Sequence, residues 1–168
     1  MIEDPAPSGG DRQDGEPQID PAMATLAGDG VTRALGMELL EARPGYARIA
    51  MEIDHHMLNG HGIAHGGYVF TLADTAFGAA SNSGRPMTVA ASAAIDFLAP
   101  ARAGDRLVAE AEERVHNSRS GITDVTVWRD GPQPIRVAEF RGRSRTFTDP
   151  AATDPAPGEA TPPGPQGG

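Results

Sequence analysis

A glycine-rich hinge that leads directly into an apolar run with one carboxylate constrains this chain more than any other feature. The hinge is His65-Gly66-Gly67, and Asp74 is the only charged residue between Tyr68 and Ala80. Because the run is apolar on nearly every side, it predicts a helix over about 67–83 that is buried in a core. An ionised carboxylate in such a place is costly unless it is paired, hydrogen-bonded or used in chemistry.

Asp74 has two interpretations at this stage. It either satisfies a neighbouring backbone group or acts on a ligand, and the hinge favours the second interpretation. The first turn of a helix presents unpaired backbone N–H groups with a partial positive charge, and glycine lets a ligand approach them closely. The N–H of Gly66 or Gly67 is therefore predicted to hold a developing oxyanion, as acyl-transfer chemistry requires.

Outside this helix the apolar pattern is mostly that of strands separated by turn residues. We expect a short helical lead-in at 31–35 and strands at 36–41, 46–53, 88–98, 106–116, 122–129 and 135–147. One long buried helix with several consecutive strands after it predicts an α+β fold, in which an antiparallel sheet wraps around the helix.

Composition divides the chain into three parts. Residues 1–21 hold four prolines, six acidic residues and one Arg, and residues 149–168 hold six prolines, four glycines and three acidic residues. Such segments lack the apolar residues needed to fold, so we expect disordered tails there and one domain at 22–148. Subtracting tail charges of −5 and −3 from the total of −9 leaves −1 for the domain. A near-neutral domain argues against nucleic acid as a partner.

The residue types that the chain lacks narrow its chemistry further. It contains no Cys, and all 14 basic residues are Arg. A cysteine nucleophile, a thiolate metal site and a Schiff-base lysine are thereby excluded. No apolar stretch is long enough to cross a bilayer and no secretory signal is visible, which predicts a cytoplasmic protein without a membrane partner. The four histidines between positions 55 and 65 lack metal-site spacing, so we expect no metal and no cofactor.

The motifs around the hinge occur in the order and spacing of a known family. They are Asn59, His65-Gly66-Gly67, Phe70, Leu72-Ala73-Asp74 and Ala76-Phe77, followed by Ile95-Asp96-Phe97-Leu98-Ala99-Pro100 and Gly104-Asp105. Over about 36–147 the chain resembles the hotdog-fold acyl-CoA thioesterases of the PaaI type, which are associated with bacterial phenylacetate degradation. The resemblance implies a hotdog fold and an acyl-CoA substrate, with phenylacetyl-CoA or hydroxyphenylacetyl-CoA as the expected acyl class.

The resemblance also implies roles for individual residues. Asp74 is implied as the catalytic carboxylate and Gly66 as the oxyanion donor at the helix start. Asn59 and His65 are implied as catalytic neighbours around the thioester. The implied substrate contacts are Gly67 and Ser92.

The spacing along the helix predicts an oligomer. Gly66 and Asp74 are eight residues apart, which is about 12 Å along a helix axis, so they cannot both touch one thioester carbonyl. Two subunits with antiparallel helices would bring the Asp74 of one to the Gly66 of the other, and a two-fold axis supplies two such sites. We therefore expect a homodimer as the minimal active unit. Hotdog thioesterases are similar in this respect and often form homotetramers from two dimers, which we also expect.

Three classes of function remain open from the sequence. The first is a thioester hydrolase in which Asp74 either attacks the carbonyl or activates a water molecule. The second is another hotdog activity, the dehydration or hydration of acyl thioesters. The third is a module that binds acyl-CoA without turning it over. The carboxylate at the thioesterase position of the family favours the first.

Alternating arginines at 141, 143 and 145 also have two interpretations. Most such runs form a solvated sheet face. In a protein that binds coenzyme A, they can instead contact the nucleotide phosphates, which Arg binds with two parallel hydrogen bonds.

Overall fold

The computed structural model describes residues 28–147, so the predicted tails and the first residues of the predicted domain lie outside the described range. Its elements are helix α2 (Gly30–Ala34), strands β1 (Glu38–Arg43) and β2 (Tyr46–Glu52), the 3₁₀ helix η1 (His55–Met57), helix α3 (Gly66–Asn82), and strands β3 (Thr88–Phe97), β4 (Arg106–Asn117), β5 (Ser120–Arg129) and β6 (Ile135–Thr146). No helix in the described range is long and apolar enough to span a membrane.

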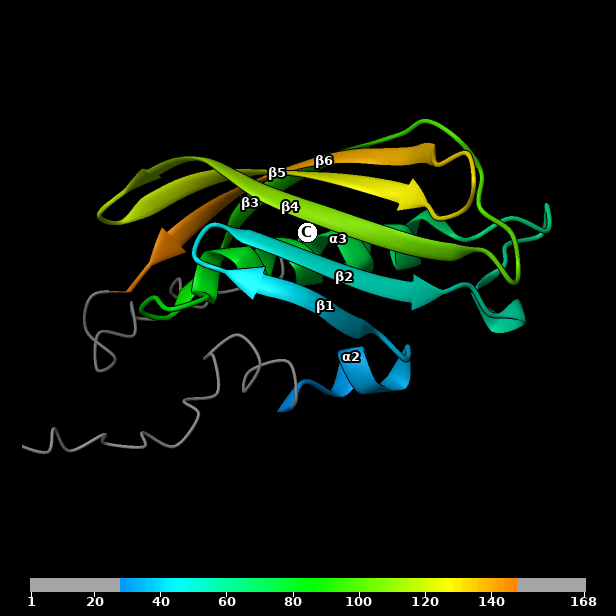
Figure 1. Cartoon of the computed structure of the whole chain (residues 1–168), viewed down its shortest axis with the longest axis horizontal. Helices are drawn as coiled ribbons and strands as arrows, with labels where there is room; N and C mark the ends of the chain where they lie inside the picture. Colours follow the sequence, from blue (N-terminus) through cyan, green and yellow to red (C-terminus); the bar gives the residue numbers. More distant parts are fainter. Residues whose placement is uncertain (1–27, 148–168) are drawn as a thin grey trace, which may run out of the picture.

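The six strands form one sheet in the order β1-β2-β4-β5-β6-β3, and every neighbouring pair is antiparallel. Helix α3 lies along one face of this sheet, and the sheet curves around it (Figure 1). Strands β1 and β3 are the two edges. The predicted α+β arrangement, an antiparallel sheet wrapped around one long helix, is confirmed.

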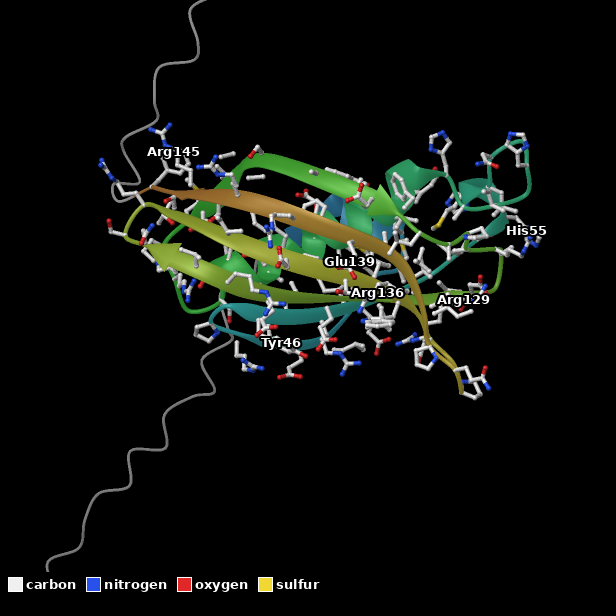
Figure 2. All side chains as sticks on the ribbon, turned by 90° about the horizontal axis from the view of Figure 1, so that it is seen from above. Tyr46, His55, Arg129, Arg136, Glu139 and Arg145 are labelled. Carbon is white, nitrogen blue, oxygen red and sulfur yellow. The ribbon has the colours of Figure 1, made fainter. Side chains whose placement is uncertain are left out.

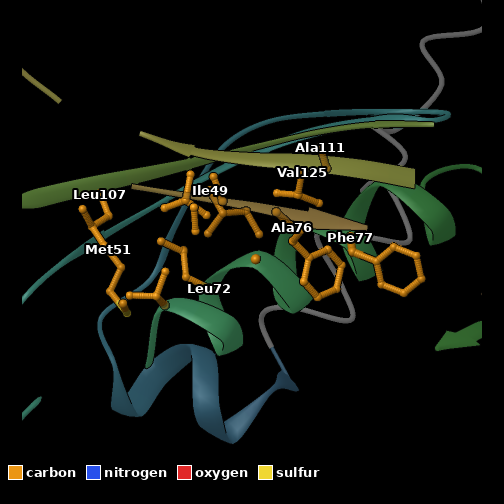
Figure 3. Close-up of a cluster of buried hydrophobic side chains, with 14 of the residues drawn as sticks. Ile49, Met51, Leu72, Ala76, Phe77, Leu107, Ala111 and Val125 are labelled. Atoms are coloured by element: carbon orange, nitrogen blue, oxygen red, sulfur yellow. The ribbon is translucent and has the colours of Figure 1, made fainter. Parts of the chain in front are cut away.

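The core lies between α3 and the inner face of the sheet (Figure 3). Leu72, Ala76 and Phe77 of α3 are at most 2% exposed, and so are the sheet residues Ile49 and Val125 that belong to the same cluster. Burial of this apolar surface supplies the main favourable free energy for holding the helix on the sheet. The helix is therefore a fixed scaffold for any group that it carries.

The opposite side of α3 differs from the prediction. Five residues that share one helical face are exposed or half-buried, namely Gly67, Thr71, Asp74, Thr75 and Gly78. This set is termed the open stripe. The threonine hydroxyls are satisfied within the helix, since Thr71 donates to the Gly67 carbonyl and Thr75 to the Thr71 carbonyl, each at 2.8 Å. The prediction of a helix buried on nearly every side is thus wrong for a single protomer.

Two predicted boundaries also shift, both at glycines with positive φ. Gly36 has φ 59° at the end of the α2 turn, and Gly45 has φ 78° in the β1–β2 hairpin. Because these two glycines make the bends, the first strand runs over Glu38–Arg43 rather than 36–41. The 3₁₀ helix η1 was not predicted, and Asp54 caps it by accepting a hydrogen bond from the backbone N–H of His55.

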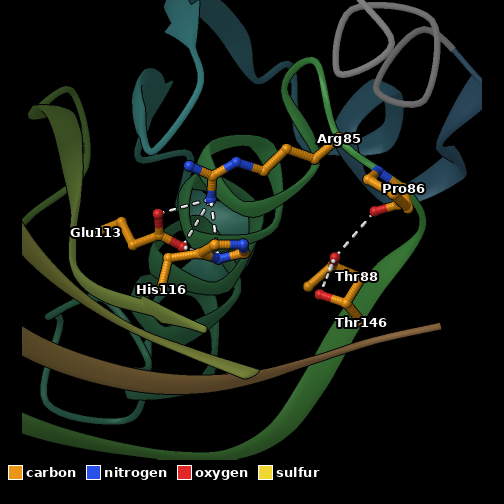
Figure 4. A network of polar contacts seen from close by, with 6 residues as sticks. All are labelled: Arg85, Pro86, Thr88, Glu113, His116 and Thr146. Atoms are coloured by element: carbon orange, nitrogen blue, oxygen red, sulfur yellow. Dashed lines mark hydrogen bonds and ion pairs between the residues drawn. The ribbon is translucent and has the colours of Figure 1, made fainter. Parts of the chain in front are cut away.

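A polar clamp fixes the carboxyl-terminal end of α3 to the sheet (Figure 4). Arg85, just after the helix, donates from Nη1 to both carboxylate oxygens of Glu113 on β4 at 2.8 and 2.6 Å, and the His116 ring lies 3.1 Å from the same carboxylate. Close by, the hydroxyls of Thr88 and Thr146 join β3 to β6 at 2.9 Å. The Glu113 side chain is only 8% exposed, so its pairing offsets the cost of burying its charge.

Gly142 on β6 provides a test of this packing. A Cβ atom there would lie 2.7 Å from two ring carbons of Phe77 and 3.0 Å from Phe140, and both rings are buried. Gly142→Ala is therefore expected to lower the free energy of unfolding by about 1–3 kcal/mol through overpacking. Urea denaturation measures the change, and Gly60→Ala, where nothing lies within 4 Å of the added atom, is the matched control. An equal effect of the two substitutions would contradict the packing argument.

Candidate active site

The hinge is held so that α3 begins at Gly66. His65 is the N-cap, and its Nδ1 accepts a hydrogen bond from the Gly67 N–H at 3.4 Å. The loop before it is fixed by bonds from the His65 N–H to the Met57 carbonyl and from the Ala64 N–H to the Ala101 carbonyl, both at 2.8 Å. Within residues 28–147 the N–H of Gly66 has no hydrogen-bond partner. It is a free donor at the positive end of the helix dipole.

A cavity of about 510 Å³ opens beside this donor. It is lined by Asn59, Ile63, Ala64, Gly66, Val69, Val137 and the segment 97–101, and is termed the hinge cavity. Asn59 turns its Oδ1 to the backbone N–H of His61 at 2.9 Å, which leaves its Nδ2 without a partner in the described range. The cavity walls are mostly apolar, so donors there act in a poorly solvated place.

The ring of Phe97 lies close to the glycine at position 66. A Cβ atom on Gly66 would lie 2.8 Å from Cζ of the Phe97 ring. The ring therefore packs directly against the helix start and forms part of the cavity wall. Phe97 was noticed in the sequence only as part of a motif, because its contact depends on β3 returning to the amino-terminal end of α3.

Asp74 lies on the open stripe about two turns further along α3. Its carboxylate makes no hydrogen bond or ion pair within the described range, and burial raises its pKa above the ordinary value for an aspartate. A half-buried carboxylate with a raised pKa and no bonding partner in the described range is a candidate for a catalytic group. The structural interpretation, in which Asp74 satisfies a backbone group, finds no contact to support it.

The predicted site residues fall in separate places within one protomer. Asn59 and Gly66 share the hinge cavity, whereas His65 and Gly67 line a second pocket on the other side of the helix start. Asp74 lines neither of these two pockets. A single protomer thus brings the predicted oxyanion donors together but leaves the carboxylate apart from them.

Ser92 lies outside both pockets. It is exposed on β3 opposite Arg143, and it lines a surface groove of about 510 Å³ together with Arg119 and Arg145. One protomer does not place Ser92 beside Gly66 or Asn59. Its assignment as a substrate contact stays a prediction.

The alternating arginines are not equivalent. Arg141 donates from Nε and Nη2 to the two carboxylate oxygens of Asp124 at 2.6 and 2.8 Å. That bond pattern lowers the pKa of Asp124 and supports the solvated-face interpretation for Arg141. The outer face of the sheet around it is covered with polar side chains, including the ion pair of Arg136 with Glu139 (Figure 2).

The histidines near the hinge make no visible metal site. His56 places Nδ1 3.3 Å from a carboxylate oxygen of Asp54, on the exposed surface. In the described part of the chain, no group of three or more His, Cys, Asp or Glu residues has the geometry to hold a metal ion.

Comparison with known proteins places this geometry in a family. Residues 61–135 match the thioesterase superfamily. The chain is 41% identical over 123 residues to the acyl-coenzyme A thioesterase PaaI of Escherichia coli, covering 73% of this chain and 86% of that protein. The structure of Escherichia coli PaaI, from the phenylacetic acid degradation operon, superposes with a TM-score of 0.72 at 39% identity and covers 76% of this chain and 91% of that one.

Two further structures agree with this match. A mutant of the phenylacetic acid degradation protein PaaI from Thermus thermophilus gives a TM-score of 0.67 at 38% identity, covering 71% of this chain and 100% of that one. A Streptococcus mutans protein bound to acetyl-CoA gives 0.62 at 27% identity, covering 66% of this chain and 88% of that one. The sheet and helix described above are the hotdog fold. The chain therefore belongs to the thioesterase superfamily and is a thioester hydrolase of the PaaI type.

Proposed function

We propose that this protein hydrolyses acyl-CoA thioesters of the phenylacetyl-CoA or hydroxyphenylacetyl-CoA class to the free acid and coenzyme A. One observation carries the proposal: α3 begins at the Gly66 N–H and also carries the half-buried carboxylate of Asp74, and neither group has a hydrogen-bond partner among residues 28–147. The first group is suited to an oxyanion and the second to a nucleophile or base. The relatives support the substrate class, because PaaI is an acyl-coenzyme A thioesterase and the Streptococcus mutans protein holds acetyl-CoA.

The active unit in this proposal is a homodimer with two composite sites. Strand β3 supports the dimer, because it is an edge strand and is exposed at almost every position from Val89 to Phe97. Edge strands of this length are rarely left bare in soluble proteins. Antiparallel pairing of two β3 strands would place the two α3 helices side by side in opposite directions, and each open stripe would then face the partner. A dimer of dimers, the expected homotetramer, would leave these two sites intact.

The proposed reaction starts with polarisation of the thioester carbonyl. The Gly66 N–H and the free Nδ2 of Asn59 donate to the carbonyl oxygen as it becomes negative. The Asp74 carboxylate of the partner then attacks the carbonyl carbon, expels coenzyme A thiolate and forms a mixed anhydride that water opens. In the general-base alternative it removes a proton from a water molecule that attacks instead. His65 and Gly67 hold the helix start in place through their mutual hydrogen bond.

The choice of acyl group tests the proposed function directly. We expect a higher kcat/KM for phenylacetyl-CoA than for palmitoyl-CoA, because the similar PaaI protein of Escherichia coli comes from the phenylacetic acid degradation operon. The measurement is release of free thiol in a steady-state assay with a panel of acyl-CoA esters. Thiol release separates a hydrolase from a dehydratase and from a binding module. A higher kcat/KM for palmitoyl-CoA would refute the acyl class, and no thiol release from any ester would refute the proposed function.

A further inference from the structure

A second pocket touches the hinge on the side away from the hinge cavity. It measures about 420 Å³ and lies between α2 and the first turns of α3. Its lining is Val31, Ala34, Leu35, His65, Gly67, Tyr68 and Thr71, and it is termed the α2 pocket. Gly67 and Thr71 belong to the open stripe, so the α2 pocket opens on the same helical face as Asp74.

The side of the pocket formed by α2 is held firmly although the helix is short. Asp29 caps it, accepting from the N–H groups of Val31 and Thr32 at 3.2 and 3.1 Å and from the Thr32 hydroxyl at 2.5 Å. The Met37 N–H then donates to the Thr32 carbonyl at 2.9 Å, which ties α2 to the start of β1. Despite this fixed position, the apolar side chain of Val31 is 47% exposed. A rigid, exposed apolar wall beside a reaction centre is suited to an apolar ligand group.

The two cavities fit the two substituents of a thioester carbon. One substituent is the acyl group and the other is the sulfur with its pantetheine arm, and the two diverge from the planar carbonyl carbon. Pantetheine carries two amides and therefore needs hydrogen-bonding partners, and of the two cavities only the hinge cavity is lined by an amide side chain, that of Asn59. The α2 pocket presents mainly carbon, and the Thr71 hydroxyl in it is already bonded within the helix. Its chemistry matches a compact apolar acyl group.

We propose that the α2 pocket holds the acyl group and that Val31 limits the size of the acyl group the enzyme accepts. This assignment rests on the proposed function and adds a specificity-determining residue to it. Val31 acts from outside the reacting atoms, by shaping the space next to the carbonyl that Gly66 polarises. Discrimination by one side chain in an apolar pocket typically amounts to about 10- to 200-fold.

The test is a change of acyl selectivity on filling the pocket. Val31→Trp is expected to reduce the ratio of kcat/KM for phenylacetyl-CoA to that for acetyl-CoA by at least about tenfold. The two esters share the same coenzyme A, so a pocket that held pantetheine would affect both alike. Val115→Trp is the matched control, since Val115 is a β4 residue with 46% exposure outside both cavities, and it should leave the ratio unchanged.

An enlarging substitution provides an independent measurement. Val31→Ala is expected to raise kcat/KM for 2-naphthylacetyl-CoA relative to acetyl-CoA, and Val115→Ala is expected to have no such effect. An unchanged ratio in both Val31 variants would overturn the acyl assignment, and so would an equal loss of kcat/KM for all esters. In either case, thiol release by the wild-type protein would still support the proposed function. A wild-type protein that releases no thiol from any of the three esters would overturn both.

Discussion

Asp74→Asn is expected to lower turnover about a hundredfold or more while the protein stays folded. The amide keeps the size and shape of the side chain, but it is neither a nucleophile nor a base. No other residue in the described range forms a hydrogen bond or ion pair with the carboxylate, so the loss is not shared with a structural network. The measurement is kcat for phenylacetyl-CoA together with a thermal melt, and mass spectrometry excludes deamidation back to Asp. Wild-type turnover by a verified Asn variant would remove Asp74 from the mechanism.

The raised pKa of Asp74 predicts two further results, one for the Asp74→Asn variant and one for the wild-type protein. Because burial disfavours the ionised form, the folded state keeps the proton to a higher pH than the unfolded chain does. Stability therefore falls as pH rises from the ordinary aspartate pKa through the raised one, and the loss persists above both. Asp74→Asn should be neutral or stabilising at neutral pH for this reason. The acid limb of kcat/KM in the wild type should likewise lie above the ordinary aspartate range.

Mixing two inactive variants is expected to restore activity to about a quarter of the wild-type value. Gly66→Pro removes the oxyanion donor, and Asp74→Asn removes the carboxylate. Proline suits position 66 because the first helical residue needs no intrahelical N–H bond and because His65 is already extended, with φ −64° and ψ 131°. Random pairing makes half of the dimers mixed, and each mixed dimer has one intact site of two.

This mixing experiment has a matched control at the same position. Gly66→Ala adds a Cβ atom that meets the Phe97 ring in the same way, yet it keeps the N–H. The difference between the Pro and Ala variants therefore isolates the donor from the steric effect, since the Phe97 side chain is 55% exposed and free to shift. Recovery is measured by co-expression with two affinity tags and thiol release. If verified mixed dimers stay inactive, the two-chain site is wrong.

Local sequence features were sufficient to predict the fold and the hinge. The apolar run after His65-Gly66-Gly67 predicted α3 to within a residue or so at its start, because a glycine hinge followed by a long apolar segment leaves few alternatives. The strands after it were also predicted closely, since each is bounded by turn residues. The boundary of β1 was wrong because the positive φ of Gly36 and Gly45 decides where the chain bends, and glycine alone does not reveal its φ.

Contacts between distant segments account for what the sequence did not reveal. The packing of Phe97 on Gly66 joins residues from the two ends of the α3–β3 unit, and the α2 pocket depends on a five-residue helix whose position is set by Asp29. The pairing of Arg141 with Asp124 was likewise invisible, because it depends on the β5–β6 register. The exposure of the open stripe was not predicted for a different reason. Its residues are mostly small, and a sequence pattern does not distinguish burial by the same chain from burial by a second copy.

The exposed edge of β3 links the stability of this protein to its concentration in the cell. A newly synthesised protomer carries a strand of ten residues, almost all exposed, with free backbone donors and acceptors. In the proposed dimer a second copy covers that edge, and before pairing the same groups are open to mispairing with other chains and to proteolysis. If the dimer forms in this way, dilution lowers stability, and the melting temperature should rise with protein concentration. A cell that makes little of this enzyme would lose it faster per molecule than a cell that makes much.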